Sequence, residues 1–173
     1  MKSELSRMVK TRPLPGEVQV IEADAGERAA LAERFGLAGI DSLHAEIALD
    51  QKATAIRATG ILRAAIQQHC AISGEAFPAR IEEDVDLRFV EESDAAPAGD
   101  DEEIELEADD CDEIDYSGDS FDLGEAIAQT LGLAIDPYAK GPDADEARAK
   151  AGIKGDDAPS GPLAEALAAL KRD

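Results

Sequence analysis

The chain has 173 residues, of which 44% are hydrophobic and 3% aromatic, and its formal net charge is −22. This length suits one domain with appendages, and without tryptophan the core must be built from leucine, isoleucine, valine and alanine. The basic N-terminus is not followed by an apolar run, which excludes a secretory signal and a membrane span there. Cys70 and Cys111 do not suggest a disulfide framework. Together these features predict a cytoplasmic protein.

The negative charge is concentrated in one segment of the chain. Residues 91–122 hold 16 acidic residues and no basic residue, a net charge of −16. Residues 1–90 hold 14 acidic and 11 basic residues, and residues 123–173 hold 9 acidic and 6 basic residues, so each region carries only −3. A dense run of like charges with few apolar residues favours a solvated, self-repelling loop. We therefore expect residues 91–121 to form a flexible acidic segment between two nearly balanced regions.

The first half of the chain predicts one helix among strands. A strand is expected near residues 17–21, and a helix over residues 25–35 that Asp24 and Glu27 cap reciprocally and Gly36 ends. Three runs with alternating apolar and polar residues follow, at residues 43–50, 54–68 and 79–90. A period of two with one polar face indicates an antiparallel sheet. Gly60, inside the long second run, predicts a bulge or a sharp bend.

The second half predicts one packed helix. Asp122 and Glu125 repeat the capping-box pattern, and an apolar stripe with helical spacing runs from Leu123 to Ala134 before Pro137 ends the helix. Residues 139–161 are rich in glycine, proline, aspartate and alanine, which is typical of a linker. The last segment, residues 162–173, predicts a short helix that depends on docking for its order.

These elements predict an α+β fold. We expect an antiparallel sheet of about four strands, which could close into a barrel, with one helix after the first strand and another packed on the sheet after the acidic loop. In this organisation residues 1–16 are a flexible N-terminus, residues 17–90 form the core, and residues 122–138 complete it. The pairing order of the strands is left open, because a register error would exchange the two faces of the sheet.

No group of residues stands out as catalytic or metal-binding. His69 and Cys70 are neighbours on a strand, so their side chains should diverge, and Cys70 is interpreted as a small buried residue. The acidic run from Glu113 to Asp119 approaches the spacing of a calcium-binding loop, but Gly124 stands where the final glutamate is required. We therefore predict no catalytic residue, no metal and no cofactor.

Two surfaces are candidates for binding a partner. One face of the predicted sheet carries possible RNA or protein contacts at Arg57, Arg63, Gln67, Arg80 and Arg88. Acidic residues interleave with the last two, and aromatic stacking platforms are missing, which disfavours tight RNA binding. The other candidate is the acidic segment, which would attract a basic protein by electrostatic steering. Its candidate contacts are Asp100, Asp101, Glu102, Glu103, Asp109, Asp110, Asp112 and Glu113.

Several segments together resemble the bacterial YceD family. The run from Gln68 to Phe77, followed by the strand that ends at Val90, is similar to the central motif of that family. The other similar pieces occur in family order at residues 32–37, 42–45, 122–125, 133–138 and 162–167. The resemblance implies a role in the synthesis, processing or stability of large-subunit ribosomal RNA, with no established enzymatic activity. Some relatives have a CxxC motif where this chain has Cys70 and Ser73, so a thiolate pair for zinc cannot form here.

The resulting hypothesis is a non-enzymatic factor in the accumulation of large-subunit ribosomal RNA. It would act through a basic ribosomal or RNA-processing protein, and its association with ribosomal RNA would be indirect. The alternative is a direct RNA-binding module that uses the arginine face. An enzyme has the least support, because neither a phosphate-binding loop nor a nucleophile–base pair is present at a telling spacing.

Overall fold

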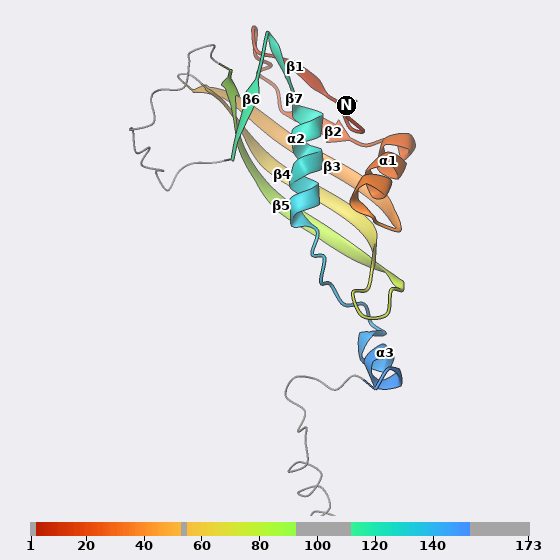
Figure 1. Ribbon diagram of the computed structural model, residues 1–173. Coiled ribbons are helices and arrows are strands. Elements are labelled where there is room, and N and C mark those ends of the chain that lie inside the picture. Colours follow the sequence, from red (N-terminus) through yellow and green to blue (C-terminus); the bar gives the residue numbers. More distant parts are fainter. Residues whose placement is uncertain (1–2, 53–54, 93–111, 153–173) are drawn as a thin grey trace, which may run out of the picture.

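The computed structural model describes residues 3–52, 55–92 and 112–152, which form seven strands and three helices (Figure 1). The strands are β1 (Met8–Lys10), β2 (Gln19–Glu22), β3 (Gly39–Lys52), β4 (Ala55–His69), β5 (Ala76–Glu91), β6 (Asp112–Tyr116) and β7 (Ser120–Asp122). The helices are α1 (Ala25–Phe35), α2 (Leu123–Ala134) and α3 (Ala144–Lys150).

Five strands form one open sheet in the order β2-β3-β4-β5-β6, and β1 pairs with β7 in a separate ribbon. The pairs from β2 to β5 are antiparallel, as the alternating sequence predicts. The prediction of about four antiparallel strands was wrong in detail, because β6 adds a fifth strand that runs parallel to β5. The sheet also does not close into a barrel, since β2 and β6 remain at opposite edges.

The first helix forms as its local chemistry predicts. The Asp24 side chain accepts the backbone N–H of Glu27 at 2.9 Å, and the Glu27 carboxylate accepts the N–H of Asp24 at 2.9 Å. Gly36 ends the helix with a φ of 64°, a left-handed conformation that glycine adopts without strain. The predicted capping box and helix end are therefore both confirmed.

Glycine is required at position 60 because β3 and β4 lie too close together there for a side chain. The predicted bulge at this residue was wrong, because the register runs unbroken through Gly60, which faces Ile47 on β3 and Val85 on β5. The register shift in β3 lies between Ile40 and Ser42 instead. A Cβ atom at position 60 would lie 1.9 Å from the carbonyl oxygen of Glu46, so only glycine allows β3 to approach β4 this closely.

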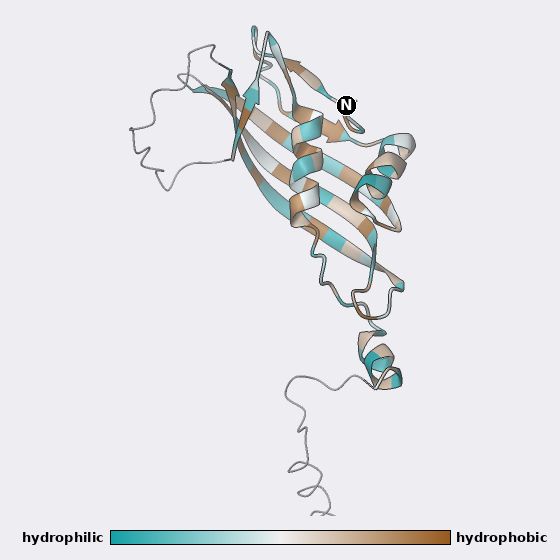
Figure 2. Cartoon of the chain, in the orientation of Figure 1, coloured by the Kyte–Doolittle hydropathy of each residue, from teal (hydrophilic) through white to brown (hydrophobic). Residues whose placement is uncertain are grey.

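The core lies between one face of the sheet and helices α1 and α2, which both cover that face (Figure 1). Apolar and polar residues alternate along the long strands (Figure 2). Leu31 of α1 and Ile127 and Leu131 of α2 are fully buried against the sheet. The rings of Phe89 on β5 and Phe121 on β7 stack with centroids 4.1 Å apart. The opposite face of the sheet is left without a covering helix among the described residues (Figure 1).

The N-terminal segment contributes to this core, although the sequence placed residues 1–16 outside it. Leu5 is fully buried and Val9 is 6% exposed. The Asp122 side chain accepts the backbone N–H of Arg7 at 2.8 Å, and the N–H of Leu123 donates to the carbonyl oxygen of Arg7 at 3.0 Å. The N-terminal segment therefore lies directly against the first turn of α2.

The later segments follow the expectations in part. Helix α2 spans residues 123–134, as the apolar stripe from Leu123 to Ala134 predicts. The region expected to be a flexible acidic segment contains β6 and β7, while residues 93–111 of that segment lie outside the described residues. The expected linker contains α3, and the helix expected at residues 162–173 lies outside the described residues.

Candidate functional site

The uncovered face of the sheet brings together all five polar residues that the sequence selected there. Arg57, Arg63 and Gln67 lie on β4, and Arg80 and Arg88 lie on β5. Arg57 pairs with Arg88 in the strand register, and Arg80 pairs with Ala65 beside Gln67. Because side chains alternate between the two faces of a strand, these five project away from the core.

Three of the four arginines form ion pairs with carboxylates on the neighbouring strand. Arg57 binds Asp86 through two hydrogen bonds, of 2.8 and 2.6 Å. Arg63 binds Glu82 at 2.7 Å, and a third pair joins Arg88 to the Glu113 carboxylate of β6 at 3.0 Å. A phosphate group would have to displace these carboxylates, which satisfy the same guanidinium donors.

The remaining two residues differ in their partners. Gln67 donates a hydrogen bond to the Asp41 carboxylate at 2.8 Å. Arg80 is exposed, and within the described part of the chain no ion pair involves it. Arg80 is thus the arginine of this face whose guanidinium is most available to an external anion.

Carboxylates outnumber arginines on this face. Among the described residues, the four arginines and Lys52 share it with nine acidic residues from β2, β3, β5 and β6: Glu22, Asp41, Glu46, Asp50, Glu82, Asp84, Asp86, Glu113 and Asp115. Nucleic-acid affinity rests largely on cationic side chains that neutralise phosphates. The face is therefore suited to basic groups better than to a polyanion.

The acidic segment is only partly described. Its candidates Asp100, Asp101, Glu102, Glu103, Asp109 and Asp110 lie outside the described residues. The backbone of Asp112 begins β6 opposite Leu87, and Glu113 is half of the ion pair with Arg88. The end of the acidic segment is thus part of the sheet, where one of its charges is neutralised by an arginine.

A second charged cluster joins the N-terminus to both packed helices. Arg34 of α1 binds Glu125 of α2 and Glu4, each at 2.9 Å. The hydrogen bonds from Arg34, Ser3 and Gln129 lower the pKa of Glu125 to about 2 against the opposing effect of burial. The predicted second capping box is half formed, because Asp122 accepts the N–H of Glu125 but the Glu125 carboxylate binds Arg34 instead. This cluster holds the N-terminal segment against α1 and α2.

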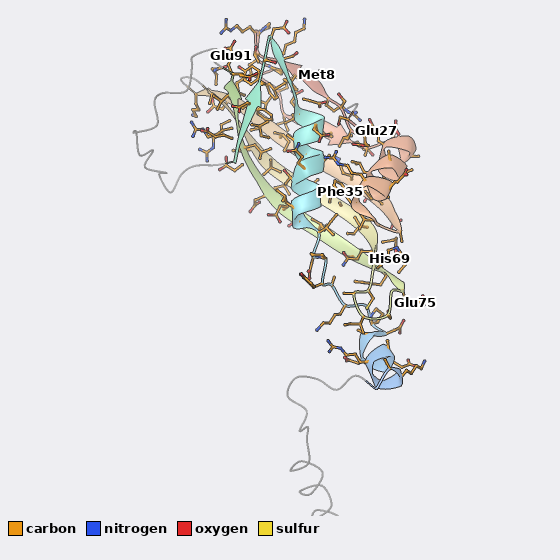
Figure 3. All side chains as sticks on the ribbon, viewed as in Figure 1. Met8, Glu27, Phe35, His69, Glu75 and Glu91 are labelled. Carbon is orange, nitrogen blue, oxygen red and sulfur yellow. The ribbon has the colours of Figure 1, made fainter. Side chains whose placement is uncertain are left out.

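The turn between β4 and β5 holds Cys70 in a hydrogen-bonded position that sequence reasoning missed. The Cys70 side chain is buried, and its Sγ accepts the backbone N–H groups of Ile72 and Ser73, each at 3.4 Å. The Ser73 side chain is the largest cause that lowers the pKa of Cys70 to about 6, followed by these amides and that of Gly141. The neighbouring His69 lies at the end of β4 (Figure 3). It is exposed, and its Nδ1 lies 3.1 Å from the Gly74 oxygen. A Cys-x-x-Ser turn is the signal that could have predicted this arrangement.

Neither a metal centre nor a membrane helix is found in the described ranges. No group of three or more His, Cys, Asp or Glu residues within them is placed to hold a metal ion. Within the same ranges, every helix is too short or too polar to cross a membrane.

The comparisons with known proteins give one match. The model of a protein family, described as "Large ribosomal RNA subunit accumulation protein YceD", matches residues 58–171. Neither the curated proteins nor the solved structures gave a match. The matched region begins inside β4 and includes the Cys70 turn, β5 and α2, and it covers more than half of the chain. The chain therefore belongs to the YceD family of large ribosomal RNA subunit accumulation proteins.

Proposed function

We propose that this protein is a non-enzymatic factor of ribosome biogenesis that supports the accumulation of large-subunit ribosomal RNA by binding a basic protein partner. Family membership supports the biological process. The observation that carries the mechanism is the excess of carboxylates over arginines on the uncovered face of the sheet. Acidic surfaces attract basic proteins over long range and disfavour RNA.

The acidic segment supports the same partner class. The 16 acidic residues in residues 91–122 supply most of the net charge of −22. Ribosomal and RNA-processing proteins are basic, so such a segment raises their rate of encounter, and salt weakens the effect because it screens charge. In this proposal the ribosomal RNA accumulates because its protein partner is held or delivered.

The test is a gene deletion followed by complementation. The ratio of large-subunit to small-subunit ribosomal RNA should fall in the deletion strain and recover with the wild-type gene. A variant in which every acidic residue of residues 93–111 becomes the corresponding amide should restore the ratio poorly and capture fewer basic proteins at low salt. Substitution is preferable to deletion, because β6 begins at Asp112 and must still reach β5.

The matched control is a variant with residues 93–111 in scrambled order, which keeps length and charge. It should behave as the wild type if electrostatics is the cause. A normal ribosomal RNA ratio in the deletion strain would contradict the proposed function. Equal capture by the amide variant and the scrambled variant would contradict the role of the acidic segment alone.

Direct RNA binding is the second candidate, and Arg80 favours it. This exposed arginine has no ion pair among the described residues and lies beside Gln67 on the uncovered face. Titration of the purified protein with fragments of ribosomal RNA at several salt concentrations decides between the two. Salt-dependent binding that Arg80→Gln abolishes would favour the RNA-binding module.

A further inference from the structure

Strand β5 is longer than β6, the edge strand with which it pairs. It spans Ala76–Glu91, but β6 pairs only with residues 87–91. Over residues 76–86, β5 pairs with β4 on one side, and no described strand lies on the other (Figure 1). An unpaired strand edge offers a row of N–H and C=O groups to another extended chain.

The structure shows which residues direct their backbone groups to this edge. Pro78 has no N–H, yet it lies within the unbroken ladder opposite Gln67, so its nitrogen faces away from β4. At the other end of the strand, the N–H of Glu92 donates to the Tyr116 oxygen of β6 at 2.8 Å. Backbone groups alternate in direction along a strand. The even-numbered residues Arg80, Glu82, Asp84 and Asp86 therefore present their N–H and C=O groups to the open edge.

The two sides of the edge differ in chemistry. On the helix side, a groove of about 320 Å³ lies between β5 and the end of α2. Val85, Leu87, Ala134 and the 83% exposed Leu133 supply its apolar lining. Thr130 and the acidic residues Glu83, Asp84 and Asp86 supply its polar lining. On the uncovered side, the side chains beside the edge are Arg80 and the carboxylates of Glu82, Asp84 and Asp86. Glu82 and Asp86 form ion pairs with arginines of β4, and the Asp84 carboxylate lies between them. An added strand would thus meet apolar side chains and the Glu83 carboxylate on the helix side, and further carboxylates on the uncovered side.

We infer that the edge of β5 over residues 80–86 binds an extended basic segment of a partner protein by strand addition. Alternate side chains of that segment would be apolar, to enter the groove beside Leu133, and cationic, to meet Asp84 and its neighbours. The inference rests on the proposed function, to which it adds the binding surface and the sequence pattern of the partner.

The charges of the edge select this occupant over two others. A second copy of this chain, paired edge to edge, would bring together two edges that each hold three carboxylates and one arginine, and like charges opposite each other are destabilising. Residues 93–111 of the same chain contain no lysine or arginine, so they would meet the same repulsion. A lysine-rich or arginine-rich strand removes the repulsion and gains attraction.

Charges on an edge strand also have a simpler use, which is to prevent aggregation. Partner binding and protection against aggregation make different predictions for a basic strand. An edge whose charges only prevent aggregation would not bind such a strand in a fixed register. The probe is a short synthetic peptide with strictly alternating lysine and valine residues. The control peptide has the same length with glycine in place of valine.

The first measurement is backbone amide hydrogen exchange by NMR on the wild-type protein. Saturating Lys-Val peptide should slow the exchange of the amides of Arg80, Glu82, Asp84 and Asp86. The amides that already bond to β4 should not change. The Lys-Gly peptide should give little protection, because it lacks the groups that would fill the groove. Unchanged exchange at all four edge amides would overturn the inference.

The second measurement is peptide affinity in two matched pairs of variants. Asp84→Pro removes a carboxylate and an edge N–H, whereas Asp84→Asn removes the charge alone; binding should weaken about tenfold in the first and about threefold in the second. Leu133→Ala should weaken binding about threefold, while Val20→Ala, at a 59% exposed residue of the opposite edge strand β2, should leave it unchanged. Circular dichroism establishes that each variant is folded.

The outcomes separate this inference from the proposed function. If Asp84→Pro and Asp84→Asn bind the peptide equally, the backbone edge is not the site. If Asp84→Pro also restores ribosomal RNA in the deletion strain, the proposed function stands and the edge inference fails. If ribosomal RNA is normal without the gene, the proposed function fails whatever the peptide does.

Discussion

The carboxylate of Glu125 on α2 lies 2.9 Å from the guanidinium of Arg34 on α1, and this pair connects the two helices that cover the sheet. Ser3 also donates a hydrogen bond to this carboxylate, so the N-terminal segment joins the two helices. The interaction requires that Glu125 be ionised.

This requirement predicts a pH dependence of stability. The pKa of Glu125 is lowered from 4.5 to about 2, so the folded state binds its proton less readily than the unfolded state. Its contribution is present above pH 4.5 and is lost as the pH falls toward about 2. The free energy of unfolding of wild type minus that of Glu125→Gln should follow this course in urea titrations. Glu33→Gln, an exposed position on α1, is the control, and a difference that does not vary with pH would contradict the assignment.

Cys70 predicts a second pH dependence, at higher pH. Its pKa is lowered from 9.0 to about 6, so ionisation stabilises the folded state, and the gain grows from about pH 6 until it is complete above pH 9.0. Ultraviolet absorbance of the thiolate, measured in a Cys111→Ser background, should show ionisation near pH 6. Ser73→Ala should raise the pKa of Cys70, because the Ser73 side chain is the largest cause of the shift. An unchanged titration in Ser73→Ala would refute this hydrogen bond.

The close approach at Gly60 predicts a large effect of one methyl group. Gly60→Ala places a Cβ atom against the backbone of β3 at Glu46. The clash is with backbone atoms, so it cannot be relieved by the rotation of a side chain. Its free energy of unfolding should fall by about 3 kcal/mol, as judged by chemical denaturation. Gly16→Ala is the matched control, because no atom lies within 4 Å of the added group there. Similar stability of the two variants would show that β3 and β4 can separate without cost.

The N-terminal segment predicts an effect that a flexible tail would not have. Leu5→Ala removes a fully buried side chain and should lower the free energy of unfolding by about 2 to 5 kcal/mol. Met8→Ala, three residues away on β1 and 61% exposed, should change it by less than about 0.5 kcal/mol. Equal thermal stability of the two variants would place the segment outside the cooperative unit.

Features that depend on neighbours in sequence could be predicted. The Asp24–Glu27 capping box needs only two residues three apart, and the strands β3 to β5 follow from a period of two over many residues. The predicted capping box at Glu125 was only half formed because local sequence does not show distant partners. The capping pattern is present, but Arg34, distant in sequence, binds the Glu125 carboxylate instead.

Features that depend on register and on distant partners could not be predicted. The run around Ile114 looks like solvated acidic chain, and it becomes β6 beside β5, where Arg88 neutralises Glu113. The sequence selected the arginine face, but the pairing of Arg57 with Asp86 depends on a strand register that composition does not determine. At Cys70 the local contacts with Ile72 and Ser73 could have been indicated by the Cys-x-x-Ser spacing, but the contribution of the distant Gly141 amide could not.

The pairing of β1 with β7 has a consequence for synthesis of the chain. The strands β2 to β5 are neighbours in both sequence and sheet, so each can pair as soon as the next one leaves the ribosome. Leu5 and Val9 are made first, yet their cover from Phe121 and the first turn of α2 is made only after residue 120. The apolar residues of the N-terminal segment therefore lack this cover until β7 and α2 have been made, and β1 pairs with β7 only after the sheet strands β2 to β5 have left the ribosome.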